Sequence, residues 1–188
     1  MGFSLILLFT QLVLLTILCL WLHSLSPHYD LIPFYLFLGG LTVILRISSV
    51  SQLYFNVVDG WRLTISSNVI LPVIMVGVLI VYIVEGTAKA RTTILSVVGI
   101  NLLVIVGVWS EQQYLLLGAS STFDLPADSP FFSDSIYSAL ASIVTFAVNL
   151  LVLVMLYQWV SNHLPNLPQW ITQSGTLLVV LITDASIF

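Results

Sequence analysis

Residues 136–160 read IYSALASIVTFAVNLLVLVMLYQWV, and no Asp, Glu, Lys or Arg occurs from Ser135 to Thr183. An apolar helix of about 20 residues, rising about 1.5 Å per residue, crosses a hydrocarbon core of about 30 Å. The run is continuous and lacks the apolar-polar alternation of a barrel strand. It therefore predicts a membrane-spanning helix.

The composition of the whole chain points the same way. Hydrophobic residues make up 59% and charged residues 6%, and the mean hydropathy is +1.12. A water-soluble fold would lack the polar residues to cover its surface, so lipid must be the main solvent. Eight acids stand against four bases without a basic cluster, which excludes nucleic acid as a partner. The single Cys19 cannot form a disulfide within the chain.

Similar runs recur along the chain and predict an all-α, polytopic transmembrane bundle that forms one integral membrane domain over residues 1–188. We expect it in the cytoplasmic (inner) membrane of a bacterium or archaeon, with the oligomeric state left open. Asp59-Gly60 between β-branched and aromatic residues predicts a hairpin within residues 51–65. The chain stops at Phe188 while still apolar, so we expect the native protein to continue. The six predicted spans are 3–22, 31–50, 66–84, 92–110, 136–160 and 170–188.

The orientation of the chain in the membrane is predicted from the Lys and Arg residues between the predicted spans. Lys89 and Arg91, between the third and fourth spans, indicate the cytosolic side, and the acidic loop 111–134, without Lys or Arg, indicates the outer side. Arg46 and Arg62 fall on the opposite side from Lys89 and Arg91 if the helices alternate. The two pairs of bases therefore favour opposite orientations.

Polar residues inside spans are the candidates for function, because an unpaired polar group in hydrocarbon is costly. Ser138, Ser142, Thr145 and Asn149 recur at spacings of four, three and four, which places them on one helix face. We predict that this face points into the bundle. It either packs closely against other helices or lines a ligand site.

Asp184 is the only acid well inside a predicted span, and an intramembrane carboxylate is a functional hypothesis by default. We expect it to point at Asn149 and to be protonated in the absence of a cation. The alternative is that it lies at the membrane interface near the chain end. Asn101 is a lone amide in the fourth span, and such amides more often bond neighbouring helices than bind a ligand.

Chemistry beyond binding has no support in the sequence. His23, His28 and His163 do not show metal-ligand spacing, and no catalytic triad, phosphate loop or Gly-x-Ser-x-Gly motif occurs. We therefore expect a protein that is not an enzyme, without cofactor or metal, whose partners are the bilayer and a small-molecule ligand.

Several segments over residues 66–188 carry a resemblance to a known family. They are the turn with Glu85, Gly86, Ala90 and Arg91, the helix from Ala141-Ser142 to Tyr157-Gln158-Trp159, and the last helix with Trp170, Ile171, Gly175, Thr176, Asp184 and Phe188. In this order they resemble the vitamin uptake transporter family, which includes queuosine-precursor transporters. The resemblance implies a helical membrane protein that takes up a small molecule.

The polar transport site of that family is mostly replaced here. Its Asp in the fifth helix falls on Leu153, its Gln residues fall on Leu150 and Leu181, and of the polar site only Asp184 clearly remains. The acids before the Gly turn are also missing, with Val78 and Ile83 near those places. Two hypotheses follow. The first is a divergent uptake transporter for a vitamin or precursor. The alternative is a membrane-embedded sensor or input domain of a signalling protein whose cytosolic module lies outside this sequence.

Overall fold

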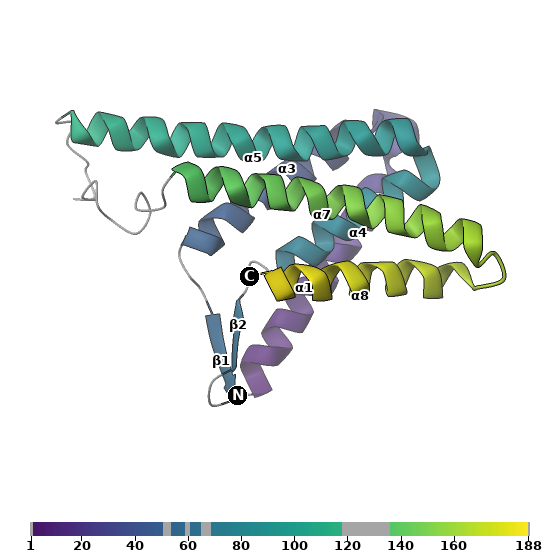
Figure 1. The fold of residues 1–188 in the computed structure, drawn as a ribbon. Coiled ribbons are helices and arrows are strands. Elements are labelled where there is room, and N and C mark those ends of the chain that lie inside the picture. Colours follow the sequence, from purple (N-terminus) through teal and green to yellow (C-terminus); the bar gives the residue numbers. More distant parts are fainter. Residues whose placement is uncertain (1, 51–53, 59–60, 65–68, 118–135, 188) are drawn as a thin grey trace.

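The computed structural model describes residues 2–50, 54–58, 61–64, 69–117 and 136–187 (Figure 1). This part of the chain is an α-helical membrane bundle with one small β-hairpin. Its elements are α1 (Gly2–Ser24), α2 (Ser26–Tyr29), α3 (Ile32–Val50), β1 (Tyr54–Val58), β2 (Trp61–Thr64), α4 (Leu71–Glu85), α5 (Thr87–Leu116), α7 (Ile136–His163) and α8 (Gln169–Ile187).

A helix occupies most of each of the six predicted spans, so the all-α prediction is confirmed. In the described residues, three segments are long and apolar enough to cross a membrane: Ile6–Ser24, Thr87–Tyr114 and Ala139–His163. Ile32–Ser48 and Leu71–Glu85 are shorter apolar helices. The protein is therefore an integral membrane protein.

Three predicted helix boundaries were wrong. Helix α5 begins at Thr87, directly after Gly86, rather than at residue 92. Helix α5 continues past residue 110 to Leu116, because Glu111 and the two glutamines after it are good helix formers and no Gly or Pro interrupts them. The acidic loop is thus shorter than predicted, and residues 118–135 of it lie outside the described residues. Helix α4 begins at Leu71 rather than residue 66, since Pro72 is favoured in a first turn.

The predicted hairpin is confirmed. Strands β1 and β2 pair antiparallel, with Tyr54 opposite Thr64 and Phe55 opposite Leu63, and the register shifts between Asn56 and Val58. Asp59 and Gly60, which carried the prediction, lie outside the described residues.

Helix α4 is the centre of the bundle. It contacts α1, α3, α5, α7 and α8, and most of its side chains are buried. Neighbouring helices come close to α4 at Gly77: a Cβ atom there would lie 2.9 Å from Leu38 Cδ2, and 3.3 Å from both Cys19 Sγ and Phe34 Cζ. Glycine at this position therefore allows α1 and α3 to pack tightly against α4.

The remaining helices are arranged around α4. Figure 1 shows α5 and α7 side by side, with α8 along the other side of α7. The α4–α5 turn at Gly86 and the α7–α8 connection lie at the same end of the bundle (Figure 1). Because the helices alternate in direction, the end of α1 and the start of α3 belong to this end as well. We call it the turn end.

The predicted orientation can be tested with single cysteines. Thr87→Cys, at the turn end, should react with a membrane-impermeant maleimide only from the cytosolic side, and Ser120→Cys, in the acidic loop, only from the outside. Cys19 provides the internal control, because it is 0% exposed and should stay unlabelled. Labelling of both new cysteines from one side would contradict the alternation of the helices.

Candidate functional site

A hydrogen bond between two polar side chains joins α7 to α8 inside the bundle. The Nδ2 atom of Asn149 donates to Oδ1 of Asp184, across a sequence separation of 35 residues. Asn149 is 5% exposed, and Asp184 is half-buried. The prediction that Asp184 points at Asn149 is confirmed.

The inner face of α8 positions Asp184. Thr172, Thr176 and Val180 are buried at intervals of four residues, and Asp184 follows four residues later, so all four lie on the face turned towards α7 and α4. The hydroxyl of Thr176 donates to the carbonyl oxygen of Thr172 at 2.8 Å. The hydroxyl of Thr176 is therefore satisfied by its own helix, whereas the carboxyl of Asp184 is bonded to α7.

The polar face predicted on α7 is confirmed only in part. Asn149 is buried, but Thr145 is half-buried and Ser142 is exposed. The Oγ1 atom of Thr145 donates to the carbonyl oxygen of Ala141 at 3.0 Å. The side chain of Ser138 lies outside the described part of the chain. The prediction that all four residues point into the bundle was thus wrong for Ser142.

The register of the two helices explains why Ser142 is exposed. Helices α7 and α8 run antiparallel, and Asp184 lies opposite Asn149 only three residues before α8 ends at Ile187. Ser142 lies about 10 Å further along α7, at about 1.5 Å per residue, and so beyond the end of α8. The same face of α7 is therefore covered at Asn149 and uncovered at Ser142.

Asn101, the remaining candidate, lies on α5 and is 7% exposed. Helix α5 packs against α7, but within the described part of the chain Asn101 makes no hydrogen bond to Asn149 or Asp184. Of the six candidate residues, the structure thus brings Asn149 and Asp184 together.

Sequence reasoning did not single out an aromatic contact between α4 and α7. The rings of Tyr82 and Tyr157 meet edge to face, with centroids 5.8 Å apart at 81°, and Tyr157 is 7% exposed. Each tyrosine lies near the C-terminal end of an apolar helix, and this shared position in the sequence could have indicated the contact.

Leucines fill the positions where the resembling transporters carry polar groups. Leu150 and Leu153 on α7 are both 0% exposed, as is Val78 on α4, and Leu181 of α8 packs against the same core. The region beside Asp184 is therefore a packed apolar core. Its polar content on α7 and α8 is concentrated in the bonded pair Asn149–Asp184.

These features define a polytopic helical membrane protein in which a polar contact joins α7 and α8. The chain belongs to the vitamin uptake-like sensor family, whose pattern matches residues 6–188. The expected relation to vitamin uptake proteins is thereby confirmed. No curated protein and no solved structure matches the chain.

Proposed function

We propose that this protein is a membrane-embedded sensor that binds a small, mostly apolar molecule of the vitamin or precursor class beside α7 and α8. The observation that carries the proposal is the complete burial of Leu150 and Leu153. A transporter needs a polar site near the midplane that opens to each side in turn. Packed leucines at those positions favour a bundle that does not alternate between two open states. Its helices would shift only slightly when a ligand binds.

The bonded pair offers such a ligand a single polar anchor. Asn149 satisfies one carboxyl oxygen of Asp184, and no described residue bonds the second oxygen, which can therefore bond a polar group on the ligand. A ligand that bonds Asp184 more strongly than Asn149 does would loosen the contact between α7 and α8. The position of α8 would then report the bound state.

Uptake is the second candidate function, and Asp184 is the observation that favours it. An intramembrane carboxylate next to an amide can bind a substrate or carry a proton. A divergent transporter would use Asp184 in this way despite the loss of the other polar residues.

Asp184→Asn separates the two functions. In proteoliposomes supplied with a labelled queuosine precursor or labelled B vitamins, we expect no accumulation by the wild type or the variant. We also expect that the variant folds, with a stability lower by about 1 kcal/mol because one hydrogen bond is altered. Melting temperatures with and without each compound measure binding independently of uptake.

Thr183→Val is the matched control, because Thr183 is exposed and its hydroxyl bonds only to the carbonyl oxygen of Val179, within α8. It should behave as the wild type in both assays. Accumulation by the wild type and Thr183→Val that is lost in Asp184→Asn would overturn the sensor proposal in favour of transport.

A further inference from the structure

A buried histidine without a hydrogen-bond partner lies at the turn end. His23, next to the last residue of α1, is 9% exposed, and its Nε2 atom has no hydrogen-bond partner in the described residues. Its ring meets the ring of Phe34 on α3 edge to face, with centroids 5.4 Å apart. An unsatisfied buried polar atom costs about 1–3 kcal/mol. The neutral ring is therefore held in an unfavourable place.

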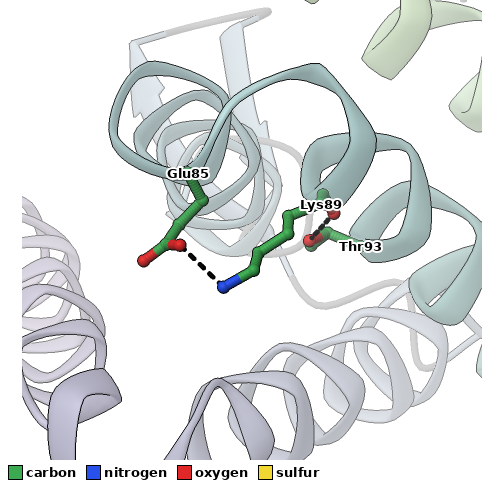
Figure 2. Close-up of polar contacts among 3 residues, drawn as sticks. All are labelled: Glu85, Lys89 and Thr93. Atoms are coloured by element: carbon green, nitrogen blue, oxygen red, sulfur yellow. Dashed lines mark hydrogen bonds and ion pairs between the residues drawn. The ribbon is translucent and has the colours of Figure 1, made fainter.

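An ion pair lies at the same end of the bundle as this ring. Lys89 Nζ is 2.8 Å from Glu85 Oε2, and the pair joins the end of α4 to the first turn of α5 (Figure 2). Helix α1, which carries His23, packs against α4, which carries Glu85. Gly86 between them has a φ of 87°, the left-handed region that favours glycine. The bond between Glu85 and Lys89 thus spans a tight turn.

This ion pair is weak enough to exchange partners. The Lys89 side chain is 48% exposed and that of Glu85 is 20% exposed. Ion pairs that water reaches contribute little to stability, because the solvent screens their attraction. The backbone of Lys89 is held separately, because Thr93 Oγ1 donates to its carbonyl oxygen at 2.8 Å (Figure 2). Release of the ammonium group to water would therefore leave α5 intact.

Other titratable groups near His23 come from the elements packed around the end of α1. Those on α2 and in the following connection are exposed, and the two tyrosines on α3 and α4 are half-buried. The groups on these elements are His28, Tyr29, Asp30, Tyr35, Tyr82, Glu85 and Lys89. Of the two carboxylates among them, Glu85 is the one on α4, which packs against α1, and Asp30 is exposed in the connection before α3.

We propose that His23 is a proton-sensitive latch that exchanges with Lys89 as the partner of Glu85. A proton from water binds Nε2 and turns it into an N–H donor with a positive charge. A buried charge requires an opposite charge, and Glu85 supplies it. Glu85 leaves Lys89, whose ammonium group is already largely hydrated. The end of α1 and the α4–α5 turn then move together, so the membrane bundle responds to pH at its turn end.

The distance between α1 and α5 tests the latch. Spin labels on Leu20→Cys and Thr92→Cys, both at exposed positions, report this distance in nanodiscs between pH 8 and pH 5, the range in which histidine titrates. We expect two distance populations that exchange with a single midpoint. His23→Gln should abolish the change. Glu85→Gln should move the midpoint to lower pH and Lys89→Gln to higher pH, because they remove opposite charges.

His28→Gln and His163→Gln are the matched controls, because both histidines are exposed at the same end, and they should leave the midpoint unchanged. A response that persists in His23→Gln, or no response in the wild type, would refute the latch. If His23→Gln does not fold, the midpoints of Glu85→Gln and Lys89→Gln decide, because the latch requires them to shift in opposite directions. Shifts of both midpoints in the same direction would also refute the latch.

Discussion

Replacing Gly77 by leucine should prevent the bundle from assembling. Even one added Cβ would lie 2.9 Å from Leu38 and 3.3 Å from both Cys19 and Phe34, and all three of these residues are 0% exposed. Adding atoms to a filled core costs about 1–3 kcal/mol and occasionally more. Gly77→Ala should therefore lower the melting temperature, and Gly77→Leu should leave no monodisperse protein in detergent.

Gly99→Leu on α5 is the control for this experiment. No atom lies within 4 Å of the position that a Cβ would take at Gly99, and the residue is exposed. Fluorescence-detected size exclusion should give the wild-type profile for this variant. Equal tolerance of leucine at both glycines would mean that α1 and α3 do not pack against α4 as described.

Introducing aspartate at Leu153 should be strongly destabilising. The substitution restores the acid that the resembling transporters carry, at a position that is 0% exposed here. A buried polar group without a partner costs about 2–7 kcal/mol. Thermal unfolding in detergent should show a large loss of stability, or no folded protein at all.

Leu153→Met controls for the loss of the leucine itself, since a swap of similar volume usually costs less than about 1.5 kcal/mol. If Leu153→Asp were as stable as the wild type, water or polar groups would have to reach position 153. That result would count against the sensor proposal, which depends on a packed apolar core beside Asp184.

The positions of the helices could be predicted from the sequence because they depend on local properties. Charge-free runs such as residues 136–160 need only length and hydropathy to be recognised. The hairpin followed from Asp59-Gly60 and its β-branched neighbours. The end of α5 was missed because Glu111 reads as a loop residue in a hydropathy profile, although it also favours helix.

The arrangement of the helices depends on contacts that sequence patterns do not encode. In lipid, a central helix such as α4 and a peripheral one such as α1 are both apolar, so hydropathy cannot distinguish them. The pairing of Asn149 with Asp184 could be predicted because intramembrane polar groups need partners. The exposure of Ser142 could not, since it depends on where α8 ends along α7.

The length of α4 has a consequence for the surrounding lipid. With 15 residues, it is about 22 Å long at about 1.5 Å per residue, shorter than a hydrocarbon core of about 30 Å. A helix of that length facing acyl chains would thin the bilayer or tilt its neighbours. Because other helices enclose α4, acyl chains adjust to α1, α5 and α7 instead. The short α4 therefore causes no hydrophobic mismatch with the surrounding lipid.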